Sequence, residues 1–247
     1  MKLTSEPHAK NSHAQRLFDG ISRSYEWPAE VFSFFQYGRW RRYLVSQLRV
    51  SPRASVLDVC TGTGLVASEI TGRFGCRVVG LDLSDGMIEQ ARHSLKSAQT
   101  AQRVCLVRGR AESLPFADSS FDVVVFTYLL RYVEDPEATL GELSRVLRPG
   151  GQMASLELFV PQNPLVHTLW LLHTRLAMPV ASRLLPTGWR AVGSFLGPSI
   201  SDFYRRHTLQ DLRELWARAG IGKPQTKLLS LGGAIVMWGQ KEVQDED

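Results

Sequence analysis

A glycine-rich loop that follows an apolar run is the feature most able to do chemistry. The run Val56–Cys60 leads directly into Thr61–Gly64, and helix-forming residues follow. Glycines lack a Cβ atom, so the backbone can turn tightly there and approach a bound cofactor closely. The pattern predicts a cofactor-binding turn whose contacts are Asp58, Cys60, Gly62, Thr63 and Gly64.

A carboxylate at the end of the next apolar run extends this site. Asp82 lies twenty residues after Gly62 and is followed by Leu83. A carboxylate at this position accepts hydrogen bonds from both ribose hydroxyls of an adenosine-bearing cofactor. The glycine spacing also satisfies a dinucleotide fingerprint, so these residues alone leave the cofactor open.

Three later motifs decide between the cofactors. They are Gly109–Phe116, Ser120–Val125 and Leu147–Gly151. Together with the glycine loop and Asp82, they resemble the ordered motif set of class I S-adenosylmethionine-dependent methyltransferases. The resemblance implies S-adenosylmethionine as the methyl donor and S-adenosylhomocysteine as a product.

Within that class the chain resembles the C-methyltransferases of ubiquinone and menaquinone biosynthesis. The similar segments are Phe18–Glu26, Thr127–Val133 and Leu229–Val236, within a resemblance that spans about residues 16 to 240. It implies methylation of a quinol ring carbon, with a prenylated quinol as the acceptor. By position, it places cofactor contacts at Thr63, Asp82, Leu83, Arg110, Ala111, Glu112 and Thr127.

Several positions depart from the family pattern. Cys60 replaces glycine or another small residue, Leu65 replaces an acid, and Arg110 replaces the Asp or Asn beside the adenine. Because a guanidinium cannot accept hydrogen bonds, the backbone of Arg110 or the side chain of Glu112 would have to meet the adenine amino group. The stretch Leu129–Tyr132 also differs from the family's Gly-Leu-Arg-Asn.

Arg131 and Tyr25 are the predicted catalytic residues. A quinol ring carbon becomes nucleophilic when a neighbouring hydroxyl ionises, and Arg131 would stabilise the resulting oxyanion. The alternative is a structural arginine paired with Glu134 or Asp135. Tyr25 would be a hydrogen-bonding partner or proton relay over the acceptor, and the alternative is a packing tyrosine in a lid.

The order of the predicted elements indicates a Rossmann-like α/β fold. Runs rich in β-branched residues predict strands at Ser55–Val59, Arg77–Leu83, Arg103–Val107, Asp122–Thr127 and Gln152–Leu158. Helical patterns between them cover Leu65–Phe74, Asp85–Ser97 and Pro136–Leu147. This alternation predicts a doubly wound, mostly parallel seven-stranded sheet with its ligand at the carboxyl ends of the strands.

Segments on either side of this core are predicted to cap it. Residues 1–50 form an N-terminal helical cap with a helix at Pro28–Leu48, and residues 51–160 form the cofactor-binding core. Residues 161–205 form a helical insertion after strand five. Residues 206–247 complete the core with a helix at Thr208–Ala219 and a hairpin of Gln225–Leu231 and Ala234–Gln240.

The insertion has two interpretations. From Asn163 and Pro164 onward it places Leu165, Leu169, Leu172 and Leu176 on one side of a helix, interspersed with arginines. Such a segment would take up an isoprenoid tail and touch an anionic bilayer. An ordinary amphipathic cap packed on the core gives the same pattern.

Composition excludes several classes of protein. No stretch of about 18 apolar residues and no signal-peptide pattern is present. Cys60, Cys76 and Cys105 lack the paired spacing of zinc ligands, so we expect no metal and predict that all three are core residues of a reduced protein. We expect this protein to be cytoplasmic, with peripheral membrane contact at most. The net charge of +5 comes from residues 1–50 and 161–218, since the other residues together carry more acids than bases.

Other functions stay open at this point. The same core would serve an O- or N-methyltransferase of another small molecule, or a protein that binds the cofactor without catalysis. The basic pI of about 9.3 suggests an RNA or DNA methyltransferase, but no Asn/Asp-Pro-Pro-aromatic motif follows strand four, so nucleic acid is not the favoured partner. The oligomeric state also stays open, a homodimer included.

Overall fold

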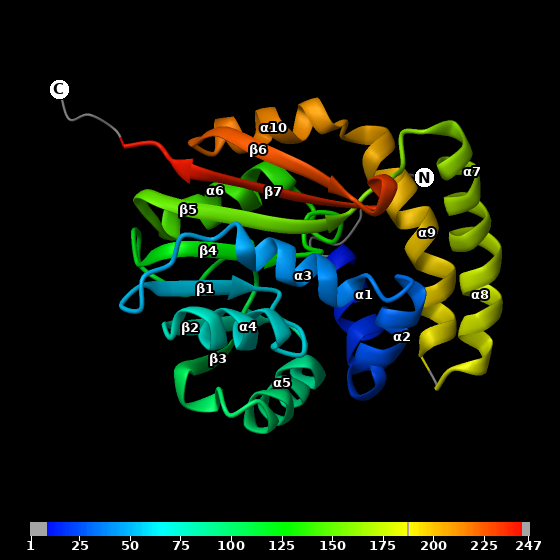
Figure 1. Ribbon diagram of the computed structural model, residues 1–247, viewed down its shortest axis with the longest axis horizontal. Helices are drawn as coiled ribbons and strands as arrows, with labels where there is room; N and C mark the ends of the chain where they lie inside the picture. The colour runs from blue at the N-terminus through cyan, green and yellow to red at the C-terminus, as the bar shows by residue number, and fades with distance from the viewer. Residues whose placement is uncertain (1–8, 187, 244–247) are drawn as a thin grey trace, which may run out of the picture.

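The computed structural model describes residues 9–186 and 188–243. A seven-stranded sheet runs through its centre in the order β3-β2-β1-β4-β5-β7-β6 (Figure 1). The strands are β1 (Ser55–Val59), β2 (Arg77–Asp82), β3 (Val104–Arg108), β4 (Phe121–Thr127), β5 (Leu147–Leu158), β6 (Ile221–Leu229) and β7 (Ala234–Lys241). The first five are parallel, and β7 pairs antiparallel with both β5 and β6. The predicted Rossmann-like fold is therefore confirmed.

Helices cover both faces of the sheet because successive side chains of each strand point to opposite sides. Val56 of β1 packs in the cluster with α3 (Tyr37–Ser46) and α4 (Leu65–Phe74). Its neighbour Leu57 belongs to the opposite cluster, with α6 (Pro136–Val146) and α10 (Leu209–Arg218). The helix α5 (Asp85–Ser97) packs against β2 and β3. Because the central strands are buried on both faces of the sheet, their sequences are continuous apolar runs.

The N-terminal segment differs from its prediction. Instead of one helix at Pro28–Leu48, the chain forms α1 (Ala9–Asp19), η1 (Ser22–Ser24), α2 (Glu26–Phe32) and α3. Phe34 and Phe35 break the helix, since both have left-handed φ angles, of 53° and 58°. The Ser33 hydroxyl accepts a hydrogen bond from Tyr37 N at 2.9 Å, which starts a new helix at that point.

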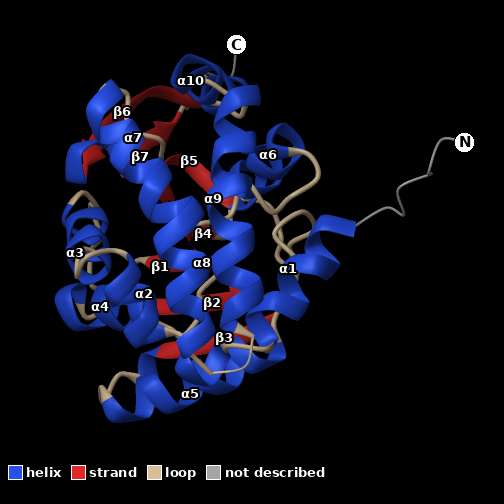
Figure 2. Ribbon diagram, turned by 90° about the vertical axis from the view of Figure 1, so that its right-hand side faces the viewer, coloured by secondary structure: helices blue, strands red, loops and turns tan. Residues whose placement is uncertain are grey.

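The insertion after strand five is helical, as predicted. It contains α7 (Pro164–Leu172), the π-helical turn η3 (His173–Ala177), α8 (Met178–Ala181), η4 (Ser182–Leu184) and α9 (Trp189–Arg206). The Asn163 side chain caps α7 by accepting from Leu165 N at 3.0 Å and from Val166 N at 3.2 Å. Figure 2 shows this insertion across the face of the molecule that is turned to the viewer.

Smaller differences arise where glycine and proline were interpreted as breaks. β5 begins at Leu147 and continues through Pro149–Gly151, and β6 begins at Ile221 and absorbs Pro224 in an irregular register. Cys105 is exposed, which corrects the prediction that all three cysteines are core residues; Cys76 is buried and Cys60 is half-buried. No helix in the described part of the chain is long and apolar enough to cross a membrane.

Candidate active site

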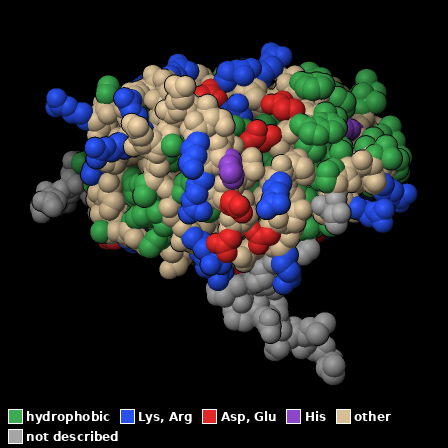
Figure 3. All heavy atoms as spheres, turned by 90° about the horizontal axis from the view of Figure 1, so that it is seen from below, with side chains coloured by type: hydrophobic (Ala, Val, Ile, Leu, Met, Phe, Trp, Pro, Cys, Tyr) green, Lys and Arg blue, Asp and Glu red, His purple; other side chains and the backbone are tan. Residues whose placement is uncertain are grey.

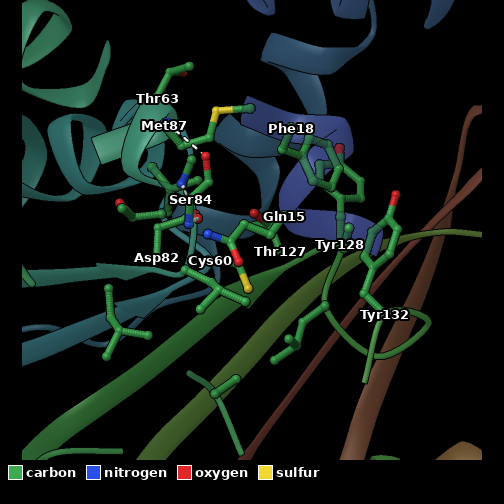
Figure 4. Close-up of a pocket in the computed structure, with 18 of the residues that line it drawn as sticks. Gln15, Phe18, Cys60, Thr63, Asp82, Ser84, Met87, Thr127, Tyr128 and Tyr132 are labelled. Atoms are coloured by element: carbon green, nitrogen blue, oxygen red, sulfur yellow. Dashed lines mark hydrogen bonds between the residues drawn. The ribbon is translucent and has the colours of Figure 1, made fainter. Parts of the chain in front are cut away.

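A cavity lies at the carboxyl ends of β1, β2, β3 and β4, and we call it the inner cavity. β1 stands between β2 and β4, so the connections leave it in opposite directions. Such a switch point opens a crevice in a doubly wound sheet. Figure 4 shows Thr63, Asp82 and Ser84 grouped at one end and Phe18, Tyr128 and Tyr132 at the other.

Asp82 connects the glycine loop to β2. Its carboxylate accepts hydrogen bonds from Gly62 N at 2.8 Å and from Ser84 N at 2.9 Å. Gly62 has a φ of +55°, a conformation that glycine adopts without strain. Burial raises the pKa of Asp82, while the backbone hydrogen bonds oppose that shift. Each carboxylate oxygen keeps a further lone pair for a ligand hydroxyl.

Most of the predicted cofactor contacts come together in this cavity. The lining includes Cys60, Gly62, Thr63, Asp82, Leu83, Arg110, Ala111, Glu112 and Thr127. The Thr63 hydroxyl oxygen and Arg110 Nη2 are buried and have no hydrogen-bond partner among the described residues. Buried polar atoms are normally paired, so these two atoms suit a polar ligand.

Asp58 and Gly64 are not part of the lining. Asp58 is fully buried beneath the loop, and its Oδ2 accepts a hydrogen bond from the Thr61 hydroxyl at 2.7 Å. Burial raises the pKa of Asp58 to about 7. Gly64 instead faces α5, where a Cβ atom would lie 3.2 Å from the Ala91 Cβ. Both residues support the loop from behind.

The sequence reasoning did not predict the wall contributed by α1. Gln15 and Phe18 of this helix line the inner cavity. Asp19 fixes the helix in place, because its Oδ1 accepts hydrogen bonds from the Ser84 hydroxyl and, at 3.2 Å, from Gly86 N at the start of α5. In the sequence, the segment Phe18–Glu26 stands out only by its resemblance to the family, and this contact gives it a structural role.

A second, larger cavity adjoins the first, and we call it the outer cavity. It has a volume of about 720 Å³ and lies between the N-terminal helices, the insertion and the β6–β7 connection. Its lining is mostly aromatic and aliphatic. Five aromatic side chains line both cavities and form the boundary between them: Phe18, Tyr25, Tyr37, Tyr128 and Tyr132.

Arg131 lies in the wall of the outer cavity. Its Nη2 donates a hydrogen bond to the Tyr132 hydroxyl at 2.9 Å, and its guanidinium stands 4.4 Å from the centre of the Tyr132 ring. Its side chain is only 5% exposed, and Nε and Nη1 have no hydrogen-bond partner among the described residues. Burial lowers the pKa of Arg131, but Tyr132 and Glu157 more than offset this and raise it, so the group stays charged.

Glu157 is a site residue that the sequence reasoning missed. Its Oε1 accepts hydrogen bonds from Leu129 N at 2.7 Å and Leu130 N at 3.0 Å, and its Oε2 lies 3.6 Å from Arg131 Nη1. Burial raises its pKa, and Arg131 opposes that shift. Glu157 is thus an acidic partner of Arg131, a role that the structural interpretation of the sequence gives to Glu134 or Asp135. An acid inside the apolar strand β5 was the available signal.

Tyr25 stands at the boundary between the two cavities. It hydrogen-bonds to Tyr37, and its ring stacks on Trp189 at 6.2 Å between centroids. Burial raises the pKa of Tyr25 well above its usual value, so this phenol is neutral. Tyr128, beside it, has a left-handed φ of 55° and a buried hydroxyl with no partner among the described residues. Strained backbone of this kind concentrates at functional sites.

Comparison with known proteins gives the family. The model of the ubiE/COQ5 methyltransferase family matches residues 6–241. The chain belongs to this family. It is therefore an enzyme, an S-adenosylmethionine-dependent methyltransferase, as the motif set predicted.

Relatives of this methyltransferase match over nearly their full length. The demethylmenaquinone methyltransferase of Lactiplantibacillus plantarum is 31% identical over 236 residues, which cover 94% of this chain and 97% of the relative. The ubiquinone/menaquinone biosynthesis C-methyltransferase UbiE of Desulfotalea psychrophila is 31% identical, covering 94% and 92%. The solved complex of the Haloferax volcanii Trm112 methyltransferase activator with a methyltransferase contains a chain of the same fold, with a TM-score of 0.66, 19% identity and coverage of 92% and 98%.

Proposed function

We propose that this methyltransferase transfers the methyl group of S-adenosylmethionine to a ring carbon of a prenylated quinol. The observation that carries the proposal is Arg131. Among the described residues that line the outer cavity, it is the one arginine, lysine or carboxylate side chain. Its Nε and Nη1 form no hydrogen bond among the described residues, and such N–H groups suit an oxyanion on an otherwise apolar acceptor. The names of the relatives that act on demethylmenaquinone agree with this acceptor.

The inner cavity suits the methyl donor. Asp82 would accept hydrogen bonds from the ribose hydroxyls, and the Thr63 hydroxyl would meet a polar group of the donor. When bound, S-adenosylmethionine supplies a methyl group that its sulfonium already activates. The residues behind the loop, Asp58 and Gly64, would hold the loop in shape without touching the donor.

The aromatic boundary would align the reactants and exclude water. In the acceptor, a ring hydroxyl would lose its proton to water, and the neighbouring ring carbon would form a bond to the methyl group as the methyl–sulfur bond breaks, which leaves S-adenosylhomocysteine. That carbon would then release its own proton to water, which restores the aromatic ring, and the ring oxygen would regain a proton. Arg131 would stabilise the oxyanion. Tyr25 and Tyr128 would offer neutral hydroxyls to the acceptor oxygens. Glu157 would be a positioning residue, because it holds Arg131 and does not line the cavity.

A labelled-methyl assay tests this proposal. The acceptor is a demethylated naphthoquinol with a short prenyl tail, kept reduced without oxygen, and label should appear on a ring carbon. Arg131→Lys should lower kcat by roughly 100-fold or more, because the planar guanidinium fork is lost. Binding of S-adenosylhomocysteine should stay within about twofold, since Arg131 does not line the inner cavity. Arg92→Lys on the exposed face of α5 is the matched control.

Two outcomes would contradict the proposal. One is transfer of label to oxygen or nitrogen of another acceptor in preference to the quinol. The other is an Arg131→Lys enzyme with wild-type kcat on the quinol.

Glu157→Gln separates positioning from acceptor binding: kcat should fall about tenfold with KM nearly unchanged, because the acceptor does not touch Glu157. The cytoplasmic location stays a prediction, and a homodimer stays one of the oligomeric states that the sequence allows.

A further inference from the structure

The insertion exposes an apolar stripe of which Leu169 alone, among the described residues, lines an active-site cavity. The consecutive helical elements from α7 to η4, residues 164–184, form one rod, and the stripe runs along it. The members of the stripe are 50% to 88% exposed: Leu165, Leu169, Leu172, Leu176, Val180 and Leu184. The opposite side of the same rod lines the outer cavity through residues such as Trp170 and Met178. The rod is therefore apolar on both sides, and packing on the core accounts for one side only.

The turn between α2 and α3 continues this surface. Phe34 and Phe35 are 67% and 70% exposed, at left-handed φ angles that turn the chain outward. Phe34 lies against His173 of η3 with 4.6 Å between ring centroids, and His173 Nε2 lies 2.9 Å from the Phe32 carbonyl oxygen. The turn and the rod are thus in contact. We call the stripe together with Phe34, Phe35 and Leu231 the apolar face.

The apolar face surrounds the mouth of the outer cavity. Phe34, Leu169 and Leu231 each line that cavity and are also 58% to 79% exposed. They come from three different elements: the α2–α3 turn, α7 and the β6–β7 connection. An apolar cavity that opens through an apolar rim offers a path to a hydrocarbon ligand without contact with water.

Ahead of Asp202, the charged side chains of the insertion all have one sign. The sequence contains no aspartate or glutamate between Glu157 and Asp202, whereas Arg175, Arg183 and Arg190 lie in that interval. All three arginines are exposed, and none forms an ion pair in the described part of the chain. Figure 3 shows hydrophobic side chains gathered at the end of the molecule that holds the insertion, with basic side chains at its edge.

From these observations we propose that the apolar face docks on the surface of an anionic lipid bilayer. The rod of residues 164–184 has a length of about 30 Å, enough for a helix that lies in the plane of the headgroups. Its leucines enter the upper acyl region, and the arginines contact lipid phosphates at the edge. In this orientation the mouth of the outer cavity faces the hydrocarbon. Large exposed apolar patches rimmed by polar residues mark interaction surfaces.

Flotation of the full-length protein with lipid vesicles tests the docking without any substrate. The protein should bind vesicles of phosphatidylcholine with about one third phosphatidylglycerol, bind pure phosphatidylcholine more weakly, and lose affinity with salt. Leu172→Asp with Leu176→Asp should lower the partition coefficient by roughly 100-fold or more, since each leucine loses its apolar contact. Arg183→Gln should lower it about fivefold. Val243→Asp and Arg92→Gln are exposed substitutions outside the face and should leave binding unchanged.

Two results would overturn the docking proposal. Wild-type protein that floats with neither vesicle, or a double variant that floats like the wild type, removes it. Light scattering adds one further outcome: a wild-type dimer that the double substitution converts to a monomer, without vesicle binding, assigns the face to a second copy of this chain.

A turnover measurement connects the face to catalysis, and this part rests on the proposed function. Leu172 and Leu176 do not line the outer cavity, so the double variant should keep wild-type turnover on a dispersed short-tail quinol. Turnover on a long-tail quinol in anionic vesicles should fall at least tenfold. Failure of flotation overturns the docking alone, whereas absence of turnover on both quinols overturns the proposed acceptor alone.

Discussion

Asp82 is a residue with two partners at once. Its carboxylate closes the glycine loop through Gly62 N and orders the next loop through Ser84 N. A proposed contact to the cofactor ribose would use the remaining lone pairs of the same oxygens. Loop geometry and cofactor affinity are thus coupled through one side chain.

Replacing Asp82 with asparagine keeps the size and removes the charge. We expect the Kd for S-adenosylhomocysteine to rise roughly 10- to 100-fold, because hydrogen bonds to a charged acceptor contribute about 1.5–3 kcal/mol. Titration calorimetry measures this directly. Asp85→Asn, which changes an exposed carboxylate nearby, should leave the Kd unchanged. Equal affinities for the wild type and Asp82→Asn would remove Asp82 from the site.

Asp58 predicts a pH dependence of stability. Its pKa is raised to about 7 in the folded protein, so the folded state retains a proton that the unfolded state releases above about pH 4. The contribution of this group to the free energy of unfolding therefore falls as the pH rises from about 4 to about 7. Asp58→Asn removes this dependence, and the variant should gain a few kcal/mol relative to the wild type between about pH 5 and about pH 8.

Urea unfolding at the two pH values checks this difference. Because both proteins share all other titrating groups, subtracting their free energies isolates Asp58. A difference that does not change with pH would show that the carboxyl titrates normally.

At the scale of elements, most of the sheet follows from the sequence. The buried strands of the parallel core are apolar on both faces, and the chain punctuates them with glycine loops and capped helices, as at Ser84 and Asp135. The break at Phe34 and Phe35 was not predictable, because aromatic residues rarely adopt positive φ angles. The Glu157 contact was also missed, since a contact between β5 and the loop after β4 depends on the three-dimensional arrangement of the strands.

The sequence leaves the direction of the leucine stripe undecided between solvent and core for a similar reason. Periodicity shows that Leu165, Leu169, Leu172 and Leu176 share one side of a helix. It does not show whether that side meets the core or the solvent, because the inner side of the rod is apolar as well. The cofactor cavity was the easier prediction, since its residues follow strand ends that the topology brings together.

Gly188 connects the insertion to the N-terminal segment. Its φ is +101°, and a Cβ atom would lie 2.8 Å from the Gly20 carbonyl oxygen and 2.9 Å from Ile21 Cγ2. Gly188→Ala should therefore destabilise the fold by about 1–3 kcal/mol. Gly141→Ala provides the contrast, because nothing lies within 4 Å of that Cβ position in α6. It should stabilise the fold by about 0.5–1 kcal/mol.

Denaturant unfolding of the two alanine variants gives both values. A Gly188→Ala protein as stable as the wild type would mean that the contact between the insertion and the N-terminal segment has no effect on stability.

At the scale of the whole molecule, two segments far apart in sequence build one cover over the sheet. Trp189 Nε1 donates to the Ser24 hydroxyl at 3.0 Å, and Trp40 Nε1 donates to the Ser230 hydroxyl at 2.8 Å. The N-terminal helices therefore contact the insertion on one side and the β6–β7 connection on the other. This cover forms walls of both cavities, and the outer cavity opens to the surface between its segments at Phe34, Leu169 and Leu231.

The helix α1 is the part of this cover that bears most directly on the cofactor. Its Gln15 and Phe18 line the inner cavity, and Asp19 attaches it to the start of α5. Local opening of α1 would uncover the cavity, and a ligand bound there suppresses that opening by mass action. With S-adenosylhomocysteine at about 100 times its Kd, amide exchange in α1 should slow by up to about 100-fold.

The helix α10 is the internal reference for this measurement. It packs on β6 and α6, away from the residues that line the inner cavity, so its early exchange through fraying should not respond to the ligand. Mass spectrometry at short exchange times resolves the two helices as separate peptides. Equal responses would mean that the ligand stabilises the molecule globally, and no response in α1 would mean that this helix does not close over the site. Slowing of amide exchange that is confined to α1 and its neighbours would show that the cover opens and closes as the cofactor leaves and binds. The N-terminal segment would then take part in cofactor binding.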